Sequence, residues 1–231
     1  MIRTARHVTI PDIMQMRTFA PRTAAAAPLV DWWTVTGKTC VAAYQPKGAA
    51  SYAASLSNLA NPGTYDASEG TAPDWTSAGG WDFNGTDDYL KTGLYPYSAW
   101  SALVQFGDTP GSSGNYLFGE YKAGESYALA VYSTGNSGWC VFFNNSADVG
   151  GALNKTSGNI GMAYTINYLD GAPSGVGTSG YAGAATTEIL IGQLGGLAGY
   201  WYDGKIYAVV VYSDTLTGGE MATVAAAMAA L

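Results

Sequence analysis

Two glutamates, Glu120 and Glu125, come closest in this sequence to a catalytic pair of carboxylates. Hydrolysis of a glycosidic bond needs two carboxyl groups that flank the bond, about 5–9 Å apart. Residues 121–124 separate the two glutamates, which is the spacing of a hairpin tip. A Glu-x-Asp-x-x-Glu run, which would place carboxylates on one face of a strand, is absent. We therefore expect a protein that is not an enzyme, with glycoside hydrolysis as the lesser alternative.

Two glycine-rich stretches match the sequence patterns of nucleotide-binding loops but lack the neighbouring residues or elements that such loops need. Residues 199–205 fit Gly-x4-Gly-Lys, but Ile206 stands where a metal-holding Ser or Thr is needed. Residues 175–180 spell Gly-x-Gly-x-x-Gly without a surrounding βαβ unit. The single histidine, His7, lies far from the other candidate residues, which argues against a Ser-His-Asp hydrolase.

Three aspartates, Asp87, Asp88 and Asp148, carry the oxygen ligands that Ca²⁺ prefers. Asp87 and Asp88 are neighbours, so on a strand their side chains would point in opposite directions. Solvated turn aspartates are the alternative interpretation. We expect no required cofactor, with Ca²⁺ as the one candidate ion.

Aromatic side chains offer a different chemistry. Sugar rings stack on Tyr and Trp, and neighbouring polar groups supply hydrogen bonds. Packing in the core is the alternative for each aromatic residue, and Trp81, Trp100 and Trp139 best fit that role. The candidate glycan-binding residues on predicted loops are Tyr95, Tyr97, Tyr121, Asn144, Tyr200 and Trp201.

Charge divides the chain into an arm and a body. Four arginines against Asp12 give the first 30 residues a net charge of +3, and six lysines against sixteen acids give the remainder −10. An acidic body argues against binding nucleic acid, because phosphate contacts need Lys and Arg clusters. We expect residues 1–38 to be a basic arm that docks on a partner, a solvated tail being the alternative. The proposed anchoring residues are Arg3, Arg6, Arg17, Arg22, Trp32 and Trp33.

The remaining residues, 39–231, have the pattern of one all-β domain. Strand-like runs and turns recur about every 8 to 14 residues, the spacing of a sandwich. Residues 160–168 alternate apolar and small or polar side chains, which predicts a strand that Asp170-Gly171 ends. Trp81 and Phe83 are expected core anchors, with Asn84-Gly85 turning between two strands. The two cysteines, Cys40 and Cys140, lie in apolar strand contexts that favour buried free thiols over a disulfide.

The last thirty residues are the most informative stretch. Residues 202–205 predict a turn, and residues 206–212 a buried strand in which Val210 faces the core. Thr217 and Glu220 have the spacing of a capping box at a helix start. The following apolar residues recur at i, i+3, i+4 and i+7, which gives a helix one apolar stripe; they are Met221, Val224, Ala225 and Met228.

These motifs resemble the laminin-G-like and concanavalin A-like jelly-roll families. The resemblance rests on this C-terminal stretch, on residues 81–90, on the Tyr168-x-Asp170-Gly171 turn and on residues 188–192. It implies an all-β, two-sheet antiparallel jelly-roll sandwich over residues 39–231, with a short C-terminal helix. Laminin-G-like domains often hold one Ca²⁺ ion, and glycoside hydrolases share the fold.

A jelly roll with a basic arm is similar to accessory proteins of tailed bacteriophages, such as head decorations or fibres. We therefore expect a virion structural protein, anchored by its arm and displaying a lectin-like sandwich for surface or glycan adhesion. A free-standing carbohydrate-binding module is the alternative. The expected partners are other capsid or tail proteins, a cell-surface glycan and further copies of the chain. The N-terminus shows no apolar segment of a secretory signal, and no run of 18 apolar residues predicts a membrane span; the expected location is the virion surface.

Overall fold

The computed structural model describes residues 31–97, 99–109, 115–122, 125–134, 137–144, 147–148, 151–152, 156–176, 185–196 and 199–231. The four arginines assigned to the arm lie outside these residues, so their anchoring role stays a prediction.

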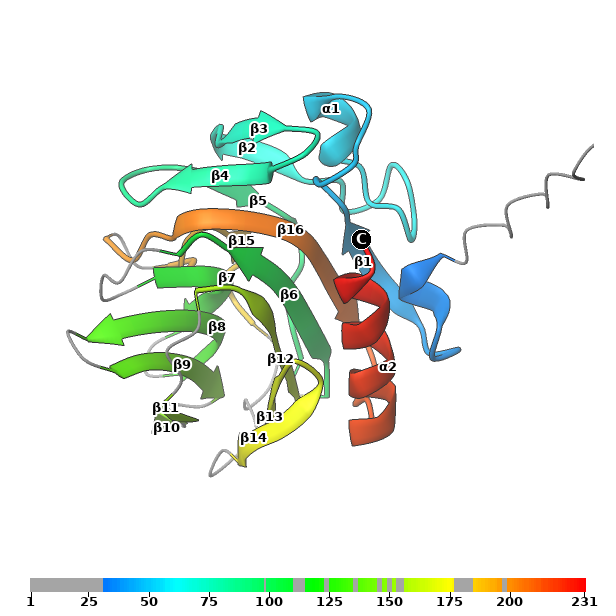
Figure 1. Ribbon diagram of the computed structural model, residues 1–231, viewed down its shortest axis with the longest axis vertical. Helices are drawn as coiled ribbons and strands as arrows, with labels where there is room; N and C mark the ends of the chain where they lie inside the picture. Colours follow the sequence, from blue (N-terminus) through cyan, green and yellow to red (C-terminus); the bar gives the residue numbers. More distant parts are fainter. Residues whose placement is uncertain are drawn as a thin grey trace, which may run out of the picture.

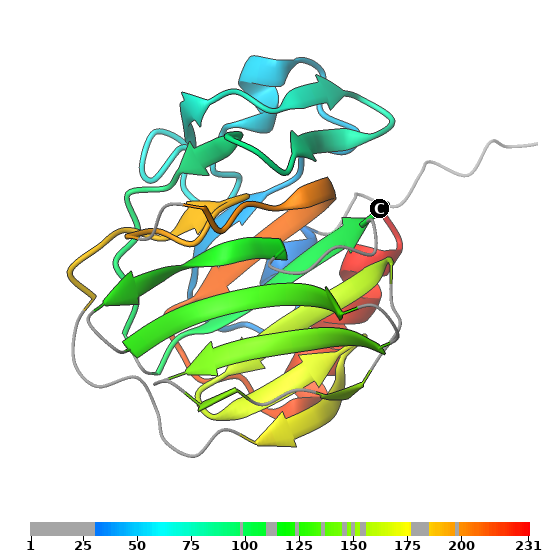
Figure 2. The ribbon, with the colours of Figure 1, turned by 90° about the vertical axis from the view of Figure 1, so that its left-hand side faces the viewer.

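Two antiparallel sheets form the body (Figures 1 and 2). The first sheet, sheet A, has the strand order β14-β13-β12-β6-β16-β4-β3, and β1 also pairs with β16. Its strands are β1 (Cys40–Tyr44), β3 (Asp74–Thr76), β4 (Gly80–Asn84), β6 (Ser101–Gly107), β12 (Gly158–Ala163), β13 (Ile166–Leu169), β14 (Ala172–Val176) and β16 (Asp203–Tyr212).

The second sheet, sheet B, has the order β10-β9-β8-β7-β15-β5-β2, and β11 also pairs with β9. Its strands are β2 (Ser68–Thr71), β5 (Tyr89–Lys91), β7 (Asn115–Lys122), β8 (Glu125–Thr134), β9 (Ser137–Asn144), β10 (Ala147–Asp148), β11 (Gly151–Ala152) and β15 (Leu190–Ile191). The predicted all-β, two-sheet fold with a C-terminal helix is confirmed.

Two separate cores hold the layers together. The larger one lies between the sheets and contains Trp81 and Phe83, as the sequence predicted, together with Val209 and Val211 of β16. The smaller one lies on the outer side of sheet A, where helix α2 (Gly218–Ala229) covers the sheet (Figure 1). Val210 belongs to this second core. Strand β16 thus buries both of its faces, which is why its sequence is apolar without alternation.

Helix α2 begins as the sequence predicted. The Thr217 side chain accepts a hydrogen bond from the Glu220 N–H, and the Glu220 carboxylate accepts one from the Thr217 N–H. The four predicted stripe residues of the helix are buried. The cap satisfies N–H groups that the first turn leaves free, and the stripe supplies the apolar contact with sheet A.

The predicted turn at Asn84-Gly85 lies between two strands, but these strands do not pair with each other as a hairpin would. Strand β4, before the turn, pairs with β16 and β3 of sheet A, whereas β5, after it, pairs with β15 and β2 of sheet B. The turn therefore carries the chain from one sheet to the other. An Asn-Gly turn suits a hairpin within one sheet as well as a connection between two sheets. Pairing with strands that are distant in the sequence decides which of the two forms.

The predicted strand over residues 160–168 is two strands, β12 and β13. Ala163 pairs with Ile166, so Tyr164 and Thr165 form a two-residue hairpin loop, and Tyr164 takes a φ of 52°. A two-residue loop puts Ala163 and Ile166 on the same face of the sheet, so the even-numbered positions change face across the turn. Ile160 and Met162 pack between the sheets, whereas Tyr168 packs under helix α2. The alternation of residue types along the sequence does not reveal this change. The predicted turn at Asp170-Gly171 lies between β13 and β14, with φ values of 47° and 79°.

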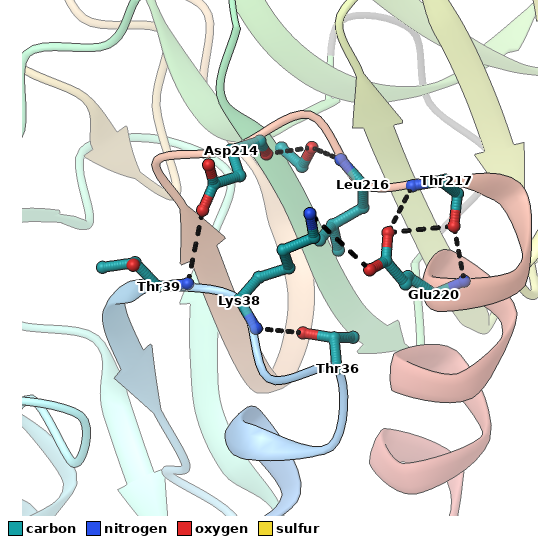
Figure 3. Close-up of polar contacts among 8 residues, drawn as sticks. Thr36, Lys38, Thr39, Asp214, Leu216, Thr217 and Glu220 are labelled. Carbon is teal, nitrogen blue, oxygen red and sulfur yellow. Dashed lines mark hydrogen bonds and ion pairs between the residues drawn. The ribbon is translucent and has the colours of Figure 1, made fainter.

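Residues 31–39 are joined to the body. A short 3₁₀ helix, η1 (Trp32–Thr34), buries Trp32 against the second core, and the Tyr212 hydroxyl donates to the carbonyl oxygen of Trp33. Figure 3 shows the next contacts, in which the Thr39 N–H donates to Asp214 and Lys38 Nζ lies 4.0 Å from Glu220 Oε1. Two residues that the sequence assigned to the arm, Trp32 and Trp33, therefore pack on the sandwich.

A second short helix, α1 (Tyr52–Ser55), lies between β1 and β2 in the chain. None of the helices in the described part of the chain is long and apolar enough to cross a bilayer.

Candidate functional site

Tyr95 and Tyr97 stand out from the connection that follows β5. Exposure alternates along residues 91–97, so that Thr92, Leu94 and Pro96 are buried. Tyr95 and Tyr97 face outward, with 49% and 53% of their surfaces exposed. The buried Leu94 anchors this segment, since its carbonyl accepts from the Ile189 N–H at 2.8 Å. A fixed backbone therefore presents two tyrosine rings to solvent.

Two further aromatic residues extend this pair. Tyr65, 44% exposed, lies over Gly93: a Cβ built on Gly93 would be 3.7 Å from the Tyr65 ring. Trp100 contacts Tyr97, with ring centroids 6.0 Å apart. We call Tyr65, Tyr95, Tyr97 and Trp100 the aromatic strip. Gly93 has a φ of +67°, a backbone conformation that favours glycine at this position.

The buried side chain of Asn58 holds the loop that carries Tyr65. The side chain of Asn58 accepts from the Ala43 N–H and donates to the carbonyls of Val41 and Thr64, all within 2.9 Å. The Tyr44 hydroxyl also donates to the carbonyl of Tyr65 itself. These contacts fix the loop before β2, and Tyr65 keeps a left-handed φ of 58° within it. The ring of Tyr65 is thus placed by neighbours in the sandwich.

A second aromatic group surrounds Tyr200 and Trp201, the other predicted loop pair. The Trp201 ring lies 5.8 Å from that of Tyr89, and Tyr200 makes an edge contact with Tyr116 at 5.4 Å. Tyr200 is 40% exposed, whereas Trp201 is half-buried. Most of this group packs against the sandwich, so it presents less aromatic surface than the strip.

The two aromatic groups lie at opposite ends of β5 and β7. Strand β15 is antiparallel to both strands, so β5 and β7 run in the same direction. Tyr89 and Tyr116 lie near their starts, and Tyr95 and Tyr121 lie near or beyond their ends. The structure therefore separates the six predicted glycan-binding residues into two locations.

Tyr121 and Asn144 share the end of sheet B that leads to the strip. Asn144 pairs with Tyr127, and Tyr127 pairs with Glu120, the neighbour of Tyr121. Tyr121 is half-buried, and the side chain of Asn144 lies outside the described part of the structure, as does that of Trp139.

Glu120, the better of the two candidate catalytic carboxylates, is completely buried. Its Oε2 accepts a hydrogen bond of 2.6 Å from the Thr187 hydroxyl, whose oxygen also lies 3.1 Å from the carbonyl oxygen of Tyr121. Glu125 pairs with Lys122 across the predicted hairpin, and its side chain is not described. A carboxylate without exposed surface is poorly placed to reach a polysaccharide, which favours a structural role for Glu120.

An acidic hollow of about 380 Å³ lies near the end of β4 and contains Asp88. The Asn84 backbone N–H donates to Asp88, and the Asn84 side chain donates to Asp87. Both aspartates therefore belong to a turn rather than a strand. Burial raises the pKa of Asp88 despite the hydrogen bond from the Asn84 N–H. The pKa of Asp203 is also raised, mainly by burial and to a smaller extent by the negative charge of Asp82.

In the described residues, no three His, Cys, Asp or Glu side chains gather as a metal site would require. Asp148 lies in β10 of sheet B, and its side chain is outside the description. Asp87 and Asp88 thus have a sufficient explanation in the turn that they hold.

An apolar groove of about 560 Å³ lies where the arm joins the body. Trp32, Trp33, Leu59 and the C-terminal residues Ala227 and Leu231 are among the residues that line it. The indole N–H of Trp32 donates to the Gln45 side chain, which fixes one wall. The two tryptophans thus form the boundary between the arm and the second core.

Sequence reasoning missed Tyr65 and Trp100 as members of the aromatic surface. No local pattern marks Tyr65, because its partner Gly93 lies 28 positions later in the chain. Trp100 was expected in the core but is only partly buried. The available signal for Tyr95 and Tyr97 was their position on either side of Pro96 in a predicted loop.

No protein-family model matches the sequence, and no curated protein matches it either. Solved structures do share the fold. Trypanosoma rangeli sialidase bound to 2,3-difluorosialic acid is 15% identical over 80% of this chain, with a TM-score of 0.56. The chain spans about a third of the length of the sialidases that it matches, 33% for a T. rangeli mutant with trans-sialidase activity.

Two other similar structures are separate domains. Domain 4 of AbnA, an extracellular GH43 arabinanase from Geobacillus stearothermophilus, was solved with arabinotriose and is 13% identical. The match covers 81% of this chain and 98% of that domain, with a TM-score of 0.53. The receptor-binding domain of botulinum neurotoxin D is 9% identical, with coverages of 81% and 52% and a TM-score of 0.52. At these identities the likeness is one of fold.

Proposed function

We propose that this protein is a non-enzymatic adhesion module that binds glycans through the aromatic strip. The observation that carries the proposal is the outward presentation of Tyr95 and Tyr97 from a segment whose alternate residues are buried. Exposed aromatic side chains that gather on one surface favour an interaction site there. The AbnA domain solved with arabinotriose has a comparable fold over nearly its whole length, which supports a sugar as the ligand.

The proposal includes no catalytic residue and no required cofactor. The burial of Glu120 supports this choice over glycoside hydrolysis. Release of reducing sugar from a bound polysaccharide, lost in Glu120→Gln, would instead establish an enzyme.

The arm is proposed to anchor the module to a larger particle, of the kind found on virion surfaces. Its charge of +3 against a body of −10 supports a docking role, since unlike charge on a partner would attract the arm and not the body. The body would then carry the glycan-binding surface outward. Capsid or tail proteins are the expected partners, and a particle that carries several copies would gain avidity.

A glycan array probed with the full chain tests the proposed function, with Ca²⁺ and with EDTA. We expect binding to a restricted set of glycans that Tyr95→Ala and Tyr97→Ala abolish. Binding that EDTA removes would add a metal to the site. An array without any specific signal would refute the adhesion role.

A separate attachment assay tests the arm. The quadruple change of Arg3, Arg6, Arg17 and Arg22 to Ala should release the protein from its particle while glycan binding persists. Attachment that is unaffected by these changes would refute the anchoring role.

A further inference from the structure

The aromatic strip has the shape of a platform along which a chain-like ligand could lie. Tyr95 and Tyr97 are two residues apart on one side of an extended segment, a separation of about 6.6 Å. Tyr65 extends the row at Gly93, and Trp100 extends it at Tyr97. From Gly93 to Tyr97 the row covers roughly 13 Å, which exceeds a single sugar ring.

Three of the four rings of the strip are exposed to solvent, and Trp100 is partly buried. Tyr65, Tyr95 and Tyr97 each expose more than 40% of their surface. An open row of rings contacts the faces of successive sugars and leaves both ends of the ligand free, whereas a pocket would enclose a terminal sugar.

The charges around the strip disfavour an anionic ligand. Lys91 is the one basic residue on the exposed side of residues 91–97. The Glu188 carboxylate lies at the same segment, where it accepts from the Gly93 N–H at 2.7 Å. The net charge of −10 outside the first 30 residues adds a repulsive field for any polyanion.

We infer that the strip binds an internal stretch of a linear, uncharged polysaccharide, several sugars at a time. This inference rests on the proposed glycan-binding function and adds to it the class of ligand and the direction in which it lies. Affinity should then grow with ligand length until the row of rings is filled, because each added sugar finds another aromatic face.

The test is calorimetric titration of the full chain with ladders of arabino-, xylo-, cello- and malto-oligosaccharides, from the monosaccharide to the hexasaccharide. Polygalacturonate and polysialic acid serve as anionic counterparts. We expect at least a tenfold gain in affinity from monosaccharide to tetrasaccharide in one neutral ladder. Tyr95→Ala and Tyr97→Ala should each reduce binding of the longer ligand at least fivefold, and Tyr97→Phe should retain it.

The control variant is Tyr164→Ala, which removes a tyrosine of similar exposure, 45%, from the β12–β13 turn. It should bind like the unchanged protein, and melting curves should show every variant to be folded. Equal affinity for monosaccharide and hexasaccharide, or preference for an anionic polymer, would overturn the inference and leave the glycan-binding function standing. Absence of binding to every ladder, polymer and array glycan would overturn both.

Discussion

At the scale of single residues, Asn58 illustrates how a buried polar side chain can support a surface site. It is fully buried, and its amide oxygen and nitrogen each serve two backbone partners. Two partners, Val41 and Ala43, belong to β1, and another, Thr64, belongs to the loop that carries Tyr65. Replacement of this side chain should destabilise the fold, because each backbone partner would lose its hydrogen bond.

We expect Asn58→Asp to destabilise the protein by at least about 3 kcal/mol, because a carboxylate cannot donate to the carbonyls of Val41 and Thr64 and buries a charge among them. The free energy of unfolding in urea measures the effect. Asn61→Asp is the matched control, since Asn61 is exposed in the same loop. A loss of equal size in both variants would contradict the role given to Asn58.

A second residue-scale prediction concerns Cys40, which is a free thiol whose Sγ donates to the Ala42 carbonyl. Burial raises the pKa of Cys40 to about 12, and the thiolate is the reactive form of cysteine. Iodoacetamide at mildly alkaline pH should therefore modify Cys40 in the unfolded protein and leave it unmodified in the native one. Peptide mass spectrometry locates the label, and rapid labelling of native Cys40 would refute the prediction.

At the scale of elements, helix α2 depends on its first turn. Hydrogen bonds from the backbone and side chain of Thr217 lower the pKa of Glu220 below its ordinary 4.5. A carboxyl group with a lowered folded-state pKa stabilises the fold above its unfolded value, and this contribution disappears as the pH falls through the folded value. Asp88 and Asp203 have raised pKa values and therefore contribute in the opposite direction.

Comparison of the unchanged protein with Glu220→Gln isolates the contribution of the charge in the cap. The glutamine side chain can still accept from the Thr217 N–H but carries no charge, so the variant should melt at a lower temperature at neutral pH. The difference between the two melting temperatures should shrink as the pH falls below 4.5. A difference that stays constant over this range would show that the Glu220 charge is not involved.

The elements also show what sequence reasoning could reach. The capping box and the apolar part of strand β16 were predictable because their signals lie within a few consecutive residues. Residues 203–205, which were predicted as part of a turn, instead belong to β16 and pair with β4. The change of sheet after Asn84 was not, since it depends on pairing with β16 and β15, more than 100 residues away. The aromatic strip was half predictable: Tyr95 and Tyr97 flank a proline in one short segment, whereas Tyr65 reaches Gly93 only through the folded chain.

At the scale of the whole molecule, sheet A separates two cores. Val209 of β16 packs between the sheets, and its neighbour Val210 packs under helix α2. The helix and the residues around Trp32 thus lie on one side of this sheet, and sheet B, whose β5 leads into Tyr95 and Tyr97, lies on the other (Figure 1).

Val210→Asp tests the second core. It should cost several kcal/mol, about 3–5, because it places an unpaired charge among apolar side chains beneath α2. Val210→Ala keeps the site apolar and should cost clearly less. Thermal and urea unfolding measure both variants, and an unchanged melting profile for Val210→Asp would contradict the burial of this residue.

This partition has an evolutionary consequence. Trp100 of the aromatic strip packs against the larger core and the three tyrosines of the strip are exposed, while the junction with the arm rests on the core beneath the helix. Under the proposed function, selection for a new sugar preference would therefore leave attachment undisturbed, and a change of partner would remodel the arm without altering the aromatic strip. Sheet A, which lies between them, would then let the two proposed traits diversify independently.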